Sequence, residues 1–235
     1  DLHGRVTQQL DANNRLSATV LYNLDDLDFI SEKNNDVIDE AVYSTWSNRL
    51  LGIEWASSLS SSAFLRTIVS HSSYHGNLDA TQNVLLVSFP GGSRLINYGN
   101  NLEDLSVKSE LEWSPLAGHA VKLGAFFTKY DLSYSTNASF EERTSEVRRD
   151  YSIGGVLVQD EIELTDRITM TPGLRITKYS SRNDPYFEPR LVVGLRVAPT
   201  LLVKAGSGIY QQWINGGQPA YFLTFSGIDF WFPVG

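Results

Sequence analysis

The chain of 235 residues contains no cysteine, and its 27 Asp and Glu against 19 Lys and Arg give a net charge of −8. The missing cysteines exclude disulfide scaffolds, thiolate catalysis and zinc sites with cysteine ligands. The acidic balance argues against nucleic acid as a partner, because nucleic-acid binding requires a basic surface. The 42% hydrophobic content argues against disorder.

Apolar and polar residues alternate over stretches of about ten residues, and this period predicts β-strands along most of the chain. The segment 167–177 is the clearest case, because its even positions are apolar and its odd positions carry Arg, Thr and Gly. A strand sends alternate side chains to opposite faces, so one face is apolar and the other is polar. In chain order, the alternation occurs over residues 16–24, 51–55, 105–113, 121–128, 167–177, 190–197 and 201–210.

The connections between the predicted strands alternate in length. Short turns are expected at residues 11–14, 60–62, 114–118, 165–166 and 198–199. Long polar loops are expected at 31–44, 78–98 and 137–147, and shorter loops at 183–185 and 215–219. Antiparallel strands would therefore return through tight turns at one end and through open loops at the other.

Two architectures accommodate such a meander. In a soluble barrel or sandwich the apolar face forms the core, whereas in an outer-membrane barrel it meets lipid and the polar face lines the lumen. The polar face here combines Gly with Arg, Lys, Glu, Thr and Tyr, as lumens do. The sequence therefore predicts an all-β fold, an antiparallel up-and-down transmembrane β-barrel segment of about 10–11 strands. Six aromatic residues near strand ends are predicted to form interfacial girdles: Tyr22, Trp46, Trp113, Tyr130, Tyr179 and Trp213.

The short turns also predict ion pairs on the lumen face. A turn at 114–118 would pair Glu110 with Lys122, and a turn at 165–166 would place Glu163 near Arg167. Such cross-strand pairs contribute roughly 0.2–1 kcal/mol each.

Several motifs follow one another in the second half of the chain. Gln159-Asp160-Glu161 precedes Pro172-Gly173-Leu174-Arg175, then Glu188-Pro189-Arg190, and residues 203–212 read Val-Lys-Ala-Gly-Ser-Gly-Ile-Tyr-Gln-Gln. In this order and spacing, the motifs resemble the barrel of TonB-dependent outer-membrane receptors. The resemblance covers residues 150–213, and before residue 150 only the strand pattern agrees.

The resemblance implies a barrel closed by a plug, whose TonB box engages the inner-membrane energy transducer. The chain shows neither plug nor TonB box, so residues 1–235 are predicted to be a partial outer-membrane β-barrel domain. The implied partners are outer-membrane lipid, a small-molecule substrate and the TonB energy transducer, reached through a plug that is not present in this chain. The implied location is the cell outer membrane of a Gram-negative bacterium.

Strand parity and loop position select candidate binding residues. Arg190 shares a face with Gly194 and Arg196, which predicts either a charge network in the wall or contact with a plug or an anionic solute. Six residues are candidates for contact with a ligand in the lumen or loops: Arg190, Glu188, Trp213, Asn215, Gln218 and Tyr221. No catalytic residue and no cofactor are predicted.

Two groups of potential metal ligands are better explained without a metal. His71 and His75 are four residues apart, roughly 13 Å along a strand, which is too far for shared ligation. An acidic stretch could offer oxygen ligands to Ca²⁺ but lacks EF-hand spacing, so a solvated extracellular loop is expected instead. This stretch consists of Asp25, Asp26, Asp28, Glu32, Asp36, Asp39 and Glu40.

The predicted function is a part in energy-coupled import of a scarce solute, of the siderophore, vitamin or glycan class, without enzymatic activity. A passive porin-like small β-barrel is the first alternative. An outer-membrane enzyme is the second, but it requires a Ser/His or Asp/His constellation. The four scattered histidines offer no convincing one: His3, His71, His75 and His119.

Overall fold

The computed structural model describes residues 1–33, 37–84, 92–138, 143–217 and 230–233. The strands are β1 (Leu2–Gln9), β2 (Asn14–Lys33), β3 (Val37–Ser60), β4 (Ala63–Val84), β5 (Gly92–Trp113), β6 (His119–Ala138), β7 (Arg143–Thr165), β8 (Ile168–Tyr179), β9 (Tyr186–Ala198), β10 (Leu201–Gly208), β11 (Ile214–Gly217) and β12 (Phe230–Pro233). No helix among the described residues is long and apolar enough to cross a membrane.

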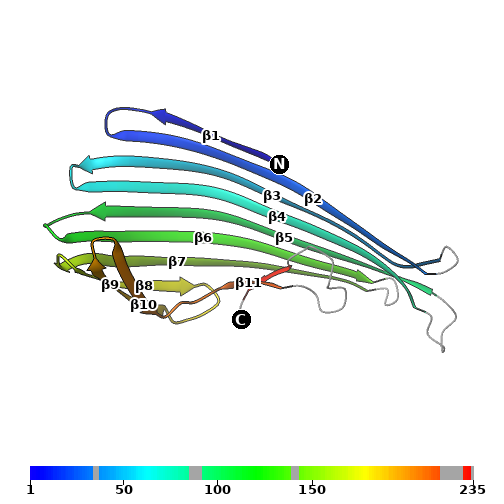
Figure 1. Ribbon diagram of the computed structural model, residues 1–235. Coiled ribbons are helices and arrows are strands. Elements are labelled where there is room, and N and C mark those ends of the chain that lie inside the picture. The colour runs from blue at the N-terminus through cyan, green and yellow to red at the C-terminus, as the bar shows by residue number, and fades with distance from the viewer. Residues whose placement is uncertain (34–36, 85–91, 139–142, 218–229, 234–235) are drawn as a thin grey trace.

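The first ten strands form one antiparallel sheet in chain order, from β1 to β10, and β11 pairs with β12 in a separate two-stranded sheet. Figure 1 shows the ten strands side by side in a curved sheet that is open between β1 and β10. The predicted all-β, up-and-down arrangement is therefore confirmed, as a barrel wall that this chain does not close.

Strands β2 to β7 are about twice as long as a bilayer requires. They contain 20 to 24 residues each, whereas β8 has 12 residues and β9 has 13. A tilted strand crosses the hydrocarbon layer in roughly 9–11 residues. The long strands therefore have one half to cross the bilayer and another half to extend beyond it.

The predicted short turns are confirmed at all five positions, because each lies between consecutive strands of the sheet. In the first, the Asp11 carboxylate accepts the backbone N–H groups of Asn13 at 2.8 Å and Asn14 at 2.9 Å. These hydrogen bonds, led by that from Asn13, lower the pKa of Asp11 below its ordinary value. In the third, Gly118 adopts a φ of 79°, which a residue with a Cβ rarely takes.

The extents of the three predicted long loops are wrong. Residues 31–33 and 37–44 belong to the paired strands β2 and β3, 78–84 and 92–98 belong to β4 and β5, and 137–138 and 143–147 belong to β6 and β7. The remainder of each loop lies outside the described residues. These segments are polar, but their backbones continue the antiparallel ladder, so polarity here does not indicate a loop.

The two faces of the sheet differ sharply in the half near the short turns, called here the short-turn half. Residues opposite one another in the register share a face. The outer face carries exposed aliphatic and aromatic side chains in continuous cross-strand rows, such as Ile53, Val69, Val107 and Phe127. The inner face carries charged and small residues. Lipid outside and a polar lumen inside account for this distribution.

In the other half of the long strands, called here the loop half, the polarity of the two faces is reversed. Along β5, the inner face changes from Glu110 and Lys108 to Leu102 and Tyr98, while the outer face changes from Val107 to Asn101. A reversal of this kind fits a wall that leaves the bilayer, because the outer face then meets water.

Hydrogen bonds link the polar side chains of the loop half across the outer face. Asn101 donates to Ser133 at 3.1 Å and also contacts His75, and Arg148 binds Asp131 at 2.6 Å. The inner face of the same half is instead apolar. Its first cluster contains Val42, Leu78 and Ala80, with Phe29, Trp46, Tyr74, Tyr98 and Tyr134 packed against it.

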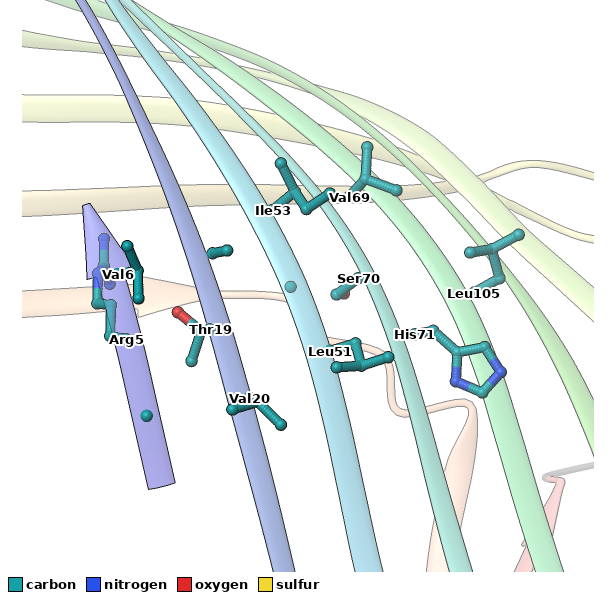
Figure 2. A pocket seen from close by; sticks show the side chains of 13 residues that line it. Arg5, Val6, Thr19, Val20, Leu51, Ile53, Val69, Ser70, His71 and Leu105 are labelled. Carbon is teal, nitrogen blue, oxygen red and sulfur yellow. The ribbon is translucent and has the colours of Figure 1, made fainter. Parts of the chain in front are cut away.

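A shallow groove of about 620 Å³ lies on the outer face near the edge strand β1. Figure 2 shows Val20, Leu51, Ile53 and Val69 around it. Gly4 and Ala18 also line the groove, and their small size leaves the hollow between the larger neighbours. The groove belongs to the apolar outer surface of the sheet.

Candidate functional site

Opposite charges on neighbouring strands pair on the inner face of the short-turn half. The Glu54 carboxylate lies 3.2 Å from the Arg5 guanidinium and 3.7 Å from that of Arg15. Glu110 lies 2.8 Å from Arg66, and Glu110 is largely buried. The wall therefore holds a charged inner surface on which Glu54 and Glu110 are already bound by neighbouring cations.

The predicted pair of Glu110 with Lys122 is wrong. Lys122 lies opposite Glu112 and binds it at 2.9 Å, while Glu110 lies opposite Gly124 and binds Lys108 at 3.1 Å. A symmetric turn at 114–118 would place Glu110 opposite Lys122. The observed register places it opposite a residue of β6 that lies two positions later.

The second predicted pair, Glu163 with Arg167, is also not formed. The register places Glu163 opposite Thr169, and an irregularity between Glu163 and Thr165 shifts the strand next to the turn. No ion pair of Glu163 or Arg167 occurs among the residues that the structure describes. Sequence spacing alone did not reveal this bulge.

Glu188 is a buried anchor on the inner face of β9. Its carboxylate accepts a hydrogen bond from the Thr177 hydroxyl at 2.8 Å and another from the backbone N–H of Gln211 at 2.9 Å. Nε of Arg175 lies 3.4 Å away. With 4% of its surface exposed, Glu188 ties β8 to the segment that follows β10.

Arg190 lies on the inner face between two glycines. The register places Gly173 of β8 on one side and Gly208 of β10 on the other. A Cβ added at Gly173 or Gly208 would lie 3.0 Å from carbon atoms of the Arg190 side chain. The predicted parity is confirmed, and the two glycines give Arg190 its space on the wall.

Trp213 lies on the inner face rather than in an interfacial girdle. Its ring centroid is 5.1 Å from that of Tyr179 and 4.5 Å from that of Tyr186. Tyr151 continues the row, because its ring contacts that of Tyr179. It also stacks on the ring of Tyr130, with the two centroids 5.0 Å apart. The indole Nε1 of Trp213 and the hydroxyl of Tyr151 are buried and have no hydrogen-bond partner among the described residues.

This aromatic row was not predicted from the sequence. The signal was present, because Tyr130, Tyr179 and Tyr186 share the parity of charged inner-face residues in their strands. The girdle prediction is therefore wrong for Trp46, Tyr130, Tyr179 and Trp213. Tyr22 and Trp113 do lie on the outer face, at opposite ends of the apolar band.

The remaining predicted residues are placed as follows. The backbone of Asn215 pairs with Phe232 between β11 and β12, and Gln218 and Tyr221 lie outside the described residues. In the acidic stretch, Asp25 lies on the inner face and Asp26 and Asp28 on the outer face. The side chains of Glu32, Asp36, Asp39 and Glu40 are outside the described part.

His71 and His75 both lie on the outer face of β4, opposite Leu105 and Asn101 respectively. They are four residues apart on one strand, as expected from the strand pattern. Within the described ranges, no three acidic or histidine side chains come together as a metal site would require.

The family model described as TonB dependent receptor-like, beta-barrel matches residues 2–226. The chain belongs to the TonB-dependent receptor β-barrel family. The sequence-based resemblance, which covered residues 150–213, is thereby confirmed and extended over the strands before residue 150. No curated protein matches the sequence.

Solved structures of receptor barrels share this fold at low sequence identity. The ferric preacinetobactin receptor BauA from Acinetobacter baumannii is 12% identical, with a TM-score of 0.61 over 95% of this chain and 41% of its own. The RagAB peptide importer is 8% identical, with a TM-score of 0.57 over 99% of this chain and 36% of its own. The siderophore receptor PiuA from Acinetobacter baumannii is 12% identical, with a TM-score of 0.54 over 88% and 37%.

The chain thus spans about two fifths of the length of these receptors. Receptors of this family are β-barrels of the Gram-negative outer membrane, and the predicted location is confirmed. In a TonB-dependent receptor barrel, the apolar outer band described above meets lipid and the charged inner face lines the lumen.

Proposed function

We propose that this chain forms part of the wall of a receptor that imports a scarce solute across the outer membrane by TonB-coupled transport. The match of residues 2–226 to the receptor barrel family is the observation that carries the proposal. Siderophore, vitamin and glycan classes are the candidate solutes. Energy coupling would run through the plug of the receptor.

The shape of the wall supports a role in capture before transport. The loop half of β2 to β7 continues beyond the apolar band, with a polar outer face and an apolar inner face. A ligand entering from outside would meet aromatic side chains such as Trp46 and Tyr74 before it reached the charged inner surface. Aromatic side chains offer large contact areas with few rotatable bonds.

Among the predicted contact residues, Arg190 and Trp213 are proposed to face the solute pathway. Both lie on the inner side of the wall, on or beside β9. Glu188 is proposed to act indirectly, because its carboxylate is buried and holds the backbone of Gln211. Asn215, Gln218 and Tyr221 remain candidates on the segment that follows.

The test is solute uptake by cells that carry the full-length protein, compared with cells that lack it, each with and without TonB. We expect the protein to support uptake of a solute class only when TonB is present. Uptake that persists without TonB would contradict the proposal and favour the passive porin-like alternative. An iron-limited, a cobalamin-limited and a glycan-limited medium would separate the three classes.

A further inference from the structure

We propose that the outer face of β3, β4 and β5 binds a single lipid whose headgroup carries both a phosphate and a primary ammonium group. Two neighbouring hollows form the site. The apolar groove described above takes an acyl chain, and a polar hollow beside it takes the headgroup. The inference goes beyond the proposed function, because it concerns the bilayer around the wall and not the imported solute.

The polar hollow, called here the headgroup hollow, has a volume of about 280 Å³. The register places Arg49 of β3 opposite Ser73 of β4, and Ser73 opposite Glu103 of β5. A cation and a carboxylate therefore flank a small hydroxyl residue, and their Cα atoms are roughly 10 Å apart across two strand spacings. The lining includes Ser47, Arg49, Ser73, His75, Asn101 and Glu103.

The headgroup hollow and the apolar groove are continuous along three strands. The next outer-face residues toward the short turns are Leu51 on β3, His71 on β4 and Leu105 on β5, and all three line the groove. Figure 2 shows these three side chains next to one another. An occupant of both hollows is therefore apolar at one end and polar at the other, as a lipid is.

The site does not depend on the open edges of the wall. Strands β3, β4 and β5 lie inside the sheet, and each has a paired neighbour on both sides. The headgroup hollow also lies where the outer face changes from apolar to polar, which is the level at which lipid headgroups meet a barrel wall.

The two charges of the headgroup hollow are available to a ligand. Neither Arg49 nor Glu103 forms an ion pair with another residue in the part of the chain that the structure describes. The guanidinium carbon of Arg49 lies 5.6 Å from the centroid of the Tyr22 ring, which supports it at the rim. Asp131, opposite Glu103 on β6, already binds Arg148 at 2.6 Å. Glu103 thus has no share in that neighbouring pair.

This charge pattern selects the headgroup. A guanidinium group binds phosphate through parallel hydrogen bonds, and a carboxylate accepts charge-assisted hydrogen bonds from an ammonium group. A headgroup with phosphate alone would be repelled by Glu103. A quaternary ammonium group has no N–H to donate to that carboxylate. Phosphoethanolamine provides both groups, with its phosphate at Arg49 and its ammonium at Glu103.

The test uses native mass spectrometry of the purified full-length protein in detergent micelles. It measures the lipid retained as phosphatidylethanolamine, phosphatidylcholine or phosphatidylglycerol is added. The variant R49Q/E103Q removes both charges of the headgroup hollow and keeps the net charge. The matched control K178Q/E146Q removes one exposed cation and one exposed anion from the outer face of β8 and β7. The variant S73W fills the floor of the hollow and changes no charge.

We expect wild-type protein and the control variant to retain one phosphatidylethanolamine, bound about tenfold more tightly than either other lipid. The R49Q/E103Q variant should lose this preference, because neither end of the headgroup then meets an opposite charge. The S73W variant should bind phosphatidylethanolamine more weakly, because the indole occupies the space of the headgroup.

Three results would overturn the inference. The first is equal affinity of wild-type protein for the three lipids, or an unchanged preference in R49Q/E103Q. The second is tighter binding of phosphatidylglycerol, because the hollow would then select negative charge alone. The third is a protein dimer in place of the lipid-bound monomer, because a second copy of the chain would then cover the groove.

Discussion

At the scale of single residues, glycines on the inner face decide how closely neighbouring side chains pack. A Cβ added at Gly155 would lie 2.4 Å from the backbone oxygen of Ile176 and 2.8 Å from the Phe126 ring, whereas one added at Gly52 meets nothing within 4 Å. We therefore expect G155A to destabilise the folded protein by about 1–3 kcal/mol. The matched variant G52A should be neutral or slightly stabilising, since glycine is unfavourable within a strand.

Urea unfolding of the full-length protein in lipid vesicles measures both variants. Equal stability of G155A and wild type would show that the backbone of β7 and β8 adjusts without cost.

The ion pairs of the inner face should differ in how much they contribute to the stability of the folded protein, according to how deeply they are buried. Glu188 is 5% exposed at its side chain and holds Thr177 and Gln211, whereas the side chain of Glu112 is 56% exposed and binds Lys122. We expect E188A to cost about 2 kcal/mol or more, because it leaves buried donors without an acceptor. E112A should cost less than about 1 kcal/mol. The same unfolding assay compares the two, and a smaller loss for E188A than for E112A would contradict the role assigned to Glu188.

At the scale of the strand, alternation predicted the elements but not their ends. The pattern in 167–177 identified β8 because an apolar and a polar face alternate there without interruption. In 78–98 the outer residues, such as Asp79 and Asn97, are polar and hydrogen-bonded to each other, and the inner ones, such as Leu78, are apolar. The phase of the alternation reverses there, so a search for apolar residues on one fixed face ends the strand too early.

Residue roles within the strands were predictable where parity alone decides them. The inner position of Arg190 followed from its spacing to Gly194. The partners of Glu110 could not be predicted from parity, because they depend on how many residues form the turn at 114–118. The position of Trp213 depends on the chain folding inward after β10, which no local pattern of the sequence indicates.

The reversal of polarity predicts where each strand leaves the bilayer. Val69 and Ser73 lie on the same outer face of β4, four residues apart, on either side of the change. Since the chain has no cysteine, V69C and S73C each introduce a single thiol into it. We expect a membrane-impermeant maleimide to label S73C on intact cells and to leave V69C unlabelled. Labelling of both, or of V69C alone, would place the bilayer elsewhere on the wall.

A charged side chain introduced on the outer face should locate the same bilayer boundary through its effect on the free energy of unfolding. Ile53 and Thr45 are exposed on the outer face of β3, one in the apolar band and one in the loop half. We expect I53K to destabilise the protein by about 2–4 kcal/mol, because lysine near the bilayer midplane carries that cost. T45K should change the stability little. Urea unfolding from vesicles measures both, and comparable losses would argue against a wall that extends beyond the bilayer.

At the scale of the whole molecule, the wall has two free edges. Strands β1 and β10 each pair on one side only within the sheet, so each presents a row of backbone N–H and C=O groups without partners from a neighbouring strand. Lipid offers no hydrogen bonds to such groups, and each unsatisfied group costs several kcal/mol in hydrocarbon. The solved receptors to which this chain is similar are more than twice as long as the part that aligns with it. Further strands of a complete receptor would supply the missing partners.

We therefore expect residues 1–235 alone to fail to refold as a monomer in detergent micelles, and the full-length protein to refold. The free edges of β1 and β10 and the exposed apolar band favour edge-to-edge association instead. Size-exclusion chromatography and the gel mobility of unheated samples distinguish the two outcomes, because folded outer-membrane barrels migrate differently before and after heating. A monodisperse, heat-modifiable monomer from residues 1–235 would show that β1 and β10 can pair with each other. The barrel would then close with ten strands, a lumen too narrow for a plug, and the passive porin-like function would become the better explanation of this wall.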